Sequence, residues 1–427
     1  MIYHRTLAYI RTNHGLSQEE FAKALGYDTE YIIALETDIV RATPEFTDRL
    51  RNELKLHDAP ITEDERAALM IRLFEFKSKI DYGELNKAEK MMSQLEKNTK
   101  ASYSPSTVNF YDLFAAYYYM TVGDKEVFDE KMAALENKTR TFSTRHKFHY
   151  KHLIGAREYV AQNYKKALDA YMEAEKLDKN FDWYDVRFIF GYGLCLSAIG
   201  YAARAVEYFR KAQHLSLWQK IYDGKPNKSY EVDIDCNLAF NLSKIGRCDE
   251  AFKILNNRLK LEKKKGSAKA RLGHVYLGIG TSYLYAKRYN DAIKTFDVAY
   301  KYPNQYNIYS ALFYRKALAF IKIGNINEGL LSIQEGLNVS SDGVWKVLLE
   351  ALKCSVMLSE PESLKHMETI IIPSLLKYYQ YAEVVKYYKE LINYHIKKGN
   401  NEAIQAHSVA IIRIYKNLYE EHIEGGL

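Results

Sequence analysis

The stretch from Arg271 to Asn304 most constrains what this chain can fold into, because its pattern recurs along most of the sequence. Its first half contains the small residue Gly280, and its second half contains Ala292 and Ala299 seven residues apart, with Phe296 between them. Small residues on one helical face allow two helices to approach closely, and an aromatic ring fills the space above them. The spacing predicts two helices joined by a short turn. Such a pair cannot bury its apolar face alone, so neighbouring pairs are expected.

The expected neighbours are present in the sequence. Two strong copies of the pattern consist of Gly155, Tyr164, Ala167, Tyr171 and Ala174, and of Gly193, Gly200, Ala205, Phe209 and Ala212. Two weaker copies keep only small residues, namely Ala239, Gly246 and Ala251, and Ala317, Gly324 and Gly329. This pattern resembles the tetratricopeptide repeat, which implies an all-α fold with a right-handed superhelix of helix pairs.

Composition agrees with a long helical array. Only 7 prolines and 21 glycines interrupt 427 residues, of which 47% are apolar. There is no apolar run of membrane-spanning length and no secretory signal pattern at the start, so we expect a cytoplasmic protein with no membrane contact. The four cysteines are too widely spaced for a disulfide framework or a zinc site; they are Cys195, Cys236, Cys248 and Cys354.

Catalytic motifs are absent from the sequence. It contains no GxSxG, HExxH, Walker glycine loop or GxGxxG. His146, His149 and His152 have offsets that a metal could use, but they have no neighbouring carboxylate, and we expect them at a solvated helix start. The sequence therefore predicts no enzyme activity, no metal and no cofactor.

The first 56 residues do not fit the repeat pattern. Ser17 and Glu20 form a capping box that begins a helix, and Gly26 ends it. A third helix is expected from Thr29 to Glu36, after Asp28 as N-cap, and a fourth from Pro44 to Leu54. This segment resembles the Xre-type helix-turn-helix DNA-binding domain, with GLSQEEFAKALG close to the second helix of that family.

This resemblance implies a site and an internal ion pair. Arg11 would pair with Glu36 inside the domain. The residues implied in contact with double-stranded DNA are Gln18, Thr29, Glu30, Ile33, Ala34 and Arg41. Residues 1–56 carry seven basic and nine acidic residues, so we expect a homodimer to be needed for useful affinity. The alternative is a helix-turn-helix that has lost its DNA role and serves protein contact.

Three segments follow from these patterns. Residues 1–56 form the helix-turn-helix domain, 57–66 a polar linker, and 67–427 a tetratricopeptide-like domain of about nine helix pairs for peptide binding and dimerisation. Within the third segment, the polar tract from Asp223 to Lys228 is expected to be an extended turn.

A groove for a ligand is expected on the first helix of each pair, which lines the concave face of such arrays. Its predicted lining residues are Arg187, Phe190, Asp233, Asn237, Phe240, Asn241, His274, Thr281, Tyr314 and Arg315. Asn237 and Asn241 share one helical face, and a carboxamide can both donate to and accept from a peptide backbone. The alternative is that both side chains are exposed or bond their own helix. Residues 57–427 carry 54 basic and 45 acidic residues, which suits a peptide carboxylate.

The two-part architecture resembles the RRNPP family of peptide-responsive quorum-sensing transcriptional regulators. That resemblance implies a cytoplasmic DNA-binding regulator controlled by a short signalling peptide in the repeat groove, with Asn237 and Asn241 as its peptide contacts. Some proteins of this fold act on a partner such as a phosphorelay response regulator, which is the alternative function. A general scaffold without a small ligand is the third reading.

Overall fold

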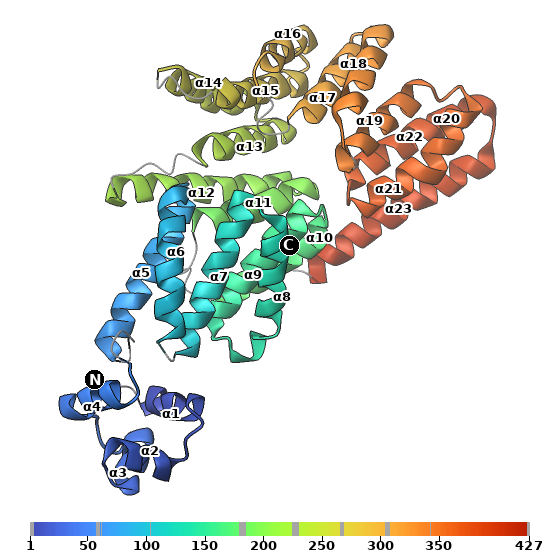
Figure 1. Cartoon of the computed structure of the whole chain (residues 1–427). Helices are drawn as coiled ribbons and strands as arrows, with labels where there is room; N and C mark the ends of the chain where they lie inside the picture. The colour runs from blue at the N-terminus through green and yellow to red at the C-terminus, as the bar shows by residue number, and fades with distance from the viewer. Residues whose placement is uncertain are drawn as a thin grey trace. The chain divides into compact units, whose positions relative to one another are not determined.

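The structure is a computed structural model that describes residues 4–56, 60, 62–102, 104–178, 185–223, 230–264, 269–303, 308–341 and 343–424. These residues fold into helices joined by turns (Figure 1), as expected for an all-α chain. They form two compact units. Unit 1 is residues 1–153 with 173–183, and unit 2 is residues 154–172 with 184–427.

Unit 1 begins with four short helices, shown in dark blue in Figure 1. They are α1 (His4–Asn13), α2 (Gln18–Leu25), α3 (Thr29–Glu36) and α4 (Pro44–Glu53). The predicted capping box is confirmed, since the Ser17 side chain accepts from the Glu20 amide at 3.1 Å and the Glu20 carboxylate accepts from the Ser17 amide at 2.7 Å. Gly26 ends α2 with a left-handed φ of 68°. Asp28 occupies the N-cap position of α3 without a side-chain bond.

The remaining helices of unit 1 form two further pairs. They are α5 (Glu63–Asp81) with α6 (Leu85–Lys100), and α7 (Pro105–Val122) with α8 (Lys125–Glu136), followed by the short η1 (Thr139–Thr141). Helix α5 is held against the first four helices. Arg66 donates to the Thr6 hydroxyl at 2.6 Å, and Arg51 pairs with Glu65 at 2.6 Å.

Helices α9 (Thr144–Val160) and α10 (Tyr164–Leu177) contribute residues to both units. The expectation that His146, His149 and His152 lie at a solvated helix start is wrong. All three are at least 97% buried, and their rings pack against aromatic side chains of α7. The reason is that α9 presents this face to α7, a helix whose buried residues include several aromatic rings.

The helices of unit 2 follow the predicted repeat copies. The clear pairs are α11 (Val186–Ala198) with α12 (Ala202–Asp223), α13 (Glu231–Lys244) with α14 (Cys248–Lys264), α15 (Lys269–Tyr285) with α16 (Tyr289–Tyr300), and α17 (Tyr309–Lys322) with α18 (Ile326–Val339). The C-terminal helices are α19 (Val344–Val356), α20 (Pro361–His366), η2 (Met367–Ile371), α21 (Ile372–Lys377), α22 (Tyr381–Lys398) and α23 (Asn401–Glu424).

Glycines under aromatic rings hold the helix pairs close together, as the repeat pattern predicts. A Cβ added to Gly280 would stand 2.6 Å from the ring of Phe296, and one added to Gly193 would stand 2.8 Å from the ring of Phe209. Only glycine permits this approach, because real Cβ atoms do not occur below about 3.0 Å from a neighbour. The alanines of the pattern, such as Ala292, are fully buried.

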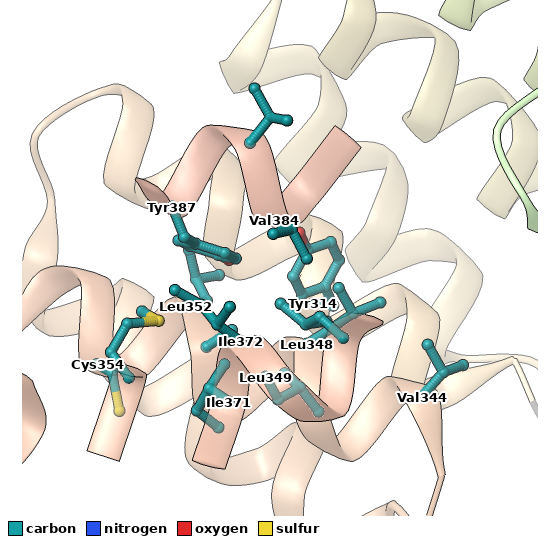
Figure 2. Packing of buried hydrophobic residues seen from close by; sticks show 14 of the residues in the cluster. Tyr314, Val344, Leu348, Leu349, Leu352, Cys354, Ile371, Ile372, Val384 and Tyr387 are labelled. Carbon is teal, nitrogen blue, oxygen red and sulfur yellow. The ribbon is translucent and has the colours of Figure 1, made fainter. Parts of the chain in front are cut away.

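The C-terminal helices share one apolar core with α17. Figure 2 shows Val384 and Tyr387 of α22 gathered with Tyr314, Leu349 and Ile371. Segment η2 is a π-helix, a rare widened turn. Pro373 follows it and explains the widening, because proline has no N–H to donate and its ring crowds the carbonyl four residues earlier.

Some expectations fall outside what the structure describes. Asp223 ends α12, but the rest of the predicted polar tract, residues 224–228, lies outside the described residues. The boundaries 1–56, 57–66 and 67–427 remain predictions, although α5 begins at Glu63, inside the predicted linker. Among the described residues, no helix combines the length and the apolar character needed to cross a membrane.

Candidate ligand cavity and helix-turn-helix surface

A cavity of about 240 Å³ lies wholly within unit 2. Its walls come from seven parts of the chain that are distant in sequence. The lining residues are Tyr159, Tyr164, Leu194, Ser197, Ala198, Cys236, Asn237, Phe240, Lys244, His274, Leu277, Gly278, Thr281, Arg315, Val344, Trp345, Leu348 and Gln380. None of these described lining residues is an aspartate or a glutamate, whereas two are cationic. The cavity therefore favours an anionic group.

Arg315 is the central cation of this cavity. Its guanidinium carbon lies 5.0 Å from the ring centroid of Phe240 and 5.3 Å from that of Trp345, so the group is held between two aromatic faces. No carboxylate among the described residues forms an ion pair with it. Arg315 is half-buried, and desolvation of its guanidinium lowers its pKa. A carboxylate entering the cavity would supply the missing counter-charge.

Lys244 brings a second positive charge to the same place. Its ammonium nitrogen lies 5.1 Å from the centroid of the Phe240 ring. Lys244 as a whole is exposed, but partial desolvation of its ammonium and, next, the Arg315 guanidinium lower its pKa, while Glu383 raises it. Glu383 is itself engaged, since it pairs with Lys386 at 3.2 Å and accepts from the Tyr314 hydroxyl at 3.5 Å. Lys244 and Arg315 thus remain available to pair with an incoming anion.

Asn237 gives the cavity an amide group. Its Nδ2 donates to the carbonyl of Asp233 at 2.9 Å, within its own helix. Its Oδ1 has no protein partner among the described residues and is free to accept a ligand N–H. The His274 ring also lines the cavity, and its Nδ1 lies 3.0 Å from a carboxylate oxygen of Asp233.

The structure brings together five of the ten predicted groove residues. The five that line the cavity are Asn237, Phe240, His274, Thr281 and Arg315. The other five do not line it; they are Arg187, Phe190, Asp233, Asn241 and Tyr314.

Asn241 illustrates why helical position alone does not place a side chain at a ligand. It is completely buried, and its Nδ2 donates to the carbonyl of Asn237 at 2.8 Å. Arg187 and Phe190 pack around Tyr230, 5.7 Å from its ring centroid. Asn237 and Asn241 thus each donate a hydrogen bond to a carbonyl of their own helix, which is the alternative expected from the sequence. Asn237 nevertheless keeps its Oδ1 available for a ligand.

Several lining residues were missed from the sequence. Lys244 could have been found, because it stands four residues after Phe240 on the same helical face. Trp345 and Gln380 could not, since they lie outside the four repeat units from which the groove residues were taken. Tyr159 lies on α9, in the copy that contains Gly155, from which no groove residue was taken. Two hydrogen bonds bring these distant segments together. The Val344 amide donates to Gln162 Oε1 at 2.9 Å, and Gln380 Nε2 donates to the Ala198 carbonyl at 2.9 Å, each across 182 residues.

The helix-turn-helix surface is in unit 1. Arg11 pairs with Glu36 through bonds of 2.7 and 3.1 Å, as the resemblance implied. Gln18 also donates to Glu36, at 2.8 Å. Of the remaining residues expected at DNA, Glu30, Ile33 and Arg41 are exposed, and Thr29 and Ala34 are half-buried. Ile39, in the turn after α3, is 76% exposed.

Known proteins resemble both the N-terminal helix-turn-helix segment and the chain as a whole. A helix-turn-helix family model matches residues 7–57. The matched segment is a helix-turn-helix domain. A search of proteins of curated function found no match.

Solved structures match most of the chain. A Rap protein complexed with competence and sporulation factor has a TM-score of 0.67 at 14% identity, covering 83% of this chain and 99% of that one. NprR in complex with its cognate peptide NprX has a TM-score of 0.67 at 16% identity, covering 82% and 99%. The apo form of the quorum sensor NprR from Bacillus thuringiensis has a TM-score of 0.61 at 17% identity, covering 82% and 99%. The all-α repeat fold expected from the sequence is thus confirmed.

Proposed function

We propose that this protein is a cytoplasmic transcriptional regulator that binds double-stranded DNA as a homodimer and is controlled by a short signalling peptide. The observation that carries the proposal is the cavity of unit 2, which places Arg315 and Lys244 beside Asn237 with no lining carboxylate. An acidic end or side chain of a peptide would pair with the cations. Its backbone N–H would donate to the Asn237 oxygen. The protein acts by binding, without catalysis.

The size of the cavity limits how much of the peptide it holds. At about 240 Å³ it is smaller than the ~300–1,000 Å³ of ordinary ligand pockets. We infer that it takes one end of the peptide, with the remainder lying along the neighbouring helices. The carboxylate end suits the two cations best. The solved NprR complex supports a peptide ligand for this fold, because that protein binds its cognate peptide NprX.

The DNA part of the proposal rests on the exposed face of α3. Glu30 and Ile33 are exposed on that helix, and Arg41 follows it. The net negative charge of residues 1–56 weakens the binding of a single helix-turn-helix domain to DNA. We therefore propose that two copies bind together. Control of a partner protein is the alternative if the full chain does not bind DNA.

Peptide binding is tested with the full chain and a pool of random peptides about seven residues long, which extend to ~25 Å. We expect the protein to retain peptides from a pool with free C-terminal carboxylates. It should retain far fewer peptides from the same pool with C-terminal amides. Arg315→Met keeps an unbranched apolar stem and removes the charge, so it should weaken the binding of a retained peptide by ~1.5–3 kcal/mol, the usual worth of a charged hydrogen bond. Affinities are measured by calorimetry.

The matched control is Arg288→Met. Arg288 also stacks on an aromatic ring, 4.6 Å from the centroid of Tyr283, but it does not line the cavity. The Arg288→Met protein should bind the peptide as the wild type does. Equal affinity of the Arg315→Met and wild-type proteins, both folded by circular dichroism, would refute the placement of the carboxylate.

A further inference from the structure

Three potential metal ligands meet in the C-terminal part of unit 2. Glu368 comes from η2, His395 from α22 and His407 from α23. Each offers one ligand atom, and these atoms all lie within 4.8 Å of one another. This cluster is separate from the cavity, because none of its members is among the cavity-lining residues.

The distances within the cluster suit one small cation. Tetrahedral ligands at about 2.0–2.1 Å from a zinc ion stand roughly 3.3 Å from each other. The Glu368 oxygen Oε1 lies 3.0 Å from His407 Nε2 and 3.6 Å from His395 Nε2, on either side of that value. One carboxylate oxygen and two imidazole nitrogens therefore already approach a common centre.

Hydrogen bonding within the protein does not account for this arrangement. His407 Nε2 and Glu368 form a hydrogen bond at 3.0 Å, but His395 Nε2 at 3.6 Å is too far to form a second one. His395 is 94% buried, and its Nε2 is a buried atom with no hydrogen-bond partner. Leaving a buried polar nitrogen without a partner costs free energy. A cation at the centre would provide that partner.

The surrounding packing holds the three side chains in place. Met367 and Ile371, on either side of Glu368 in η2, are fully buried in the C-terminal core, where Figure 2 shows Ile371. The rings of His395 and His407 lie 5.5 Å apart between centroids, and Tyr388 packs against His407 at 5.4 Å. π-Helical turns such as η2 occur frequently at functional sites. The ligands are thus fixed by the fold before any ion binds.

We propose that Glu368, His395 and His407 bind a divalent transition-metal cation, with Zn²⁺ as the preferred ion. Two imidazoles and one carboxylate suit zinc and its neighbours, whereas Mg²⁺ and Ca²⁺ prefer oxygen ligands alone. Three protein ligands leave a fourth position for water. The ion would cross-link η2, α22 and α23 and stabilise the C-terminal helices.

The test uses the untagged full chain after removal of metals with a chelator. Titration with Co²⁺, followed by its visible absorption, should show one tetrahedral site per chain, and Zn²⁺ should displace the Co²⁺. Zn²⁺ should also raise the melting temperature, because it binds only the folded state. Glu368→Gln and His407→Gln should each weaken binding by roughly tenfold or more, since even changes to groups around a metal site cost about that much.

The matched control is His366→Gln, which changes an exposed histidine two residues from Glu368. The His366→Gln protein should bind Co²⁺ and Zn²⁺ as the wild type does. Glu368 is one-third exposed, so Glu368→Gln should fold even if a change at buried His395 does not. Wild-type metal affinity in Glu368→Gln, an equal loss in His366→Gln, or no tetrahedral site in the wild type would each overturn the proposal.

Discussion

The burial of His146 shows how one side chain can make the stability of unit 1 depend on pH. Its Nδ1 accepts from the Ser143 amide at 3.1 Å, and its ring packs edge-to-face against Phe110 with 4.2 Å between centroids. Both contacts suit a neutral imidazole. Burial is the main cause that lowers the pKa of His146 to about 4, below its ordinary 6.5.

Unit 1 should therefore lose stability as the pH falls from about 6.5 towards 4. In this window the unfolded chain binds a proton at residue 146 that the folded chain does not, so acid favours unfolding. The loss at this residue is at most ~3 kcal/mol, from 1.36 kcal/mol per pKa unit. Urea unfolding of the wild type and of His146→Gln, compared at pH 7 and pH 5, measures it. An equal pH dependence in the two proteins would contradict the assignment.

Arg315 shows what sequence patterns can and cannot predict about single residues. Its place on the inner face of α17 follows from the repeat pattern. Its aromatic neighbour Trp345 does not, because that residue belongs to α19, outside the repeats whose pattern is clear. The same limit applies to Glu368, His395 and His407. Their spacing in sequence resembles no metal motif, and only the packing of three separate elements brings them together.

Helix pairs were the most predictable feature of the chain, because their close contacts depend on a few small residues at regular spacing. Gly280 on α15 lies under the ring of Phe296 on α16, and Ala292 is buried beside it. The helix-turn-helix was equally predictable, since Ser17, Glu20 and Gly26 form local caps. Side chains that depend on the neighbouring pair, such as Asn241, were not placed correctly by the helical period alone.

The contact between α15 and α16 allows a prediction in which the effect of one substitution changes sign. Gly280→Ala should destabilise the protein, because the new Cβ meets Phe296 and overpacking costs about 1–3 kcal/mol. In a Phe296→Leu background that clash is relieved, and the same change should be neutral or stabilising by up to ~1 kcal/mol through helix propensity. Chemical unfolding of the four proteins gives the coupling energy. Additive effects would show that the ring does not set the distance between these helices.

At the scale of the whole molecule, the proposed regulator needs a link between peptide and DNA. Within unit 2, the hydrogen bonds from Val344 to Gln162 and from Gln380 to Ala198 connect helices from opposite ends of the unit around the cavity. Within unit 1, Arg51 and Arg66 fasten the helix-turn-helix to α5. A peptide can alter DNA binding only if it binds two states of the protein with different affinity.

The measurement that tests the central proposal most directly is DNA affinity with and without peptide. A duplex selected by the full-length protein from a random pool is titrated by fluorescence anisotropy at fixed salt. A peptide retained by the wild-type protein is either absent or saturating. We expect the peptide to change the DNA affinity of the wild type by about fivefold or more, the lower end of ordinary coupling between sites.

Two variants assign the effect to its sites. Arg41→Ala should weaken DNA binding while leaving peptide affinity unchanged. Arg315→Met should bind DNA as the wild type does without peptide and should not respond to peptide at the concentration that saturates the wild type. The account is contradicted if saturating peptide leaves the DNA affinity of the wild-type protein unchanged.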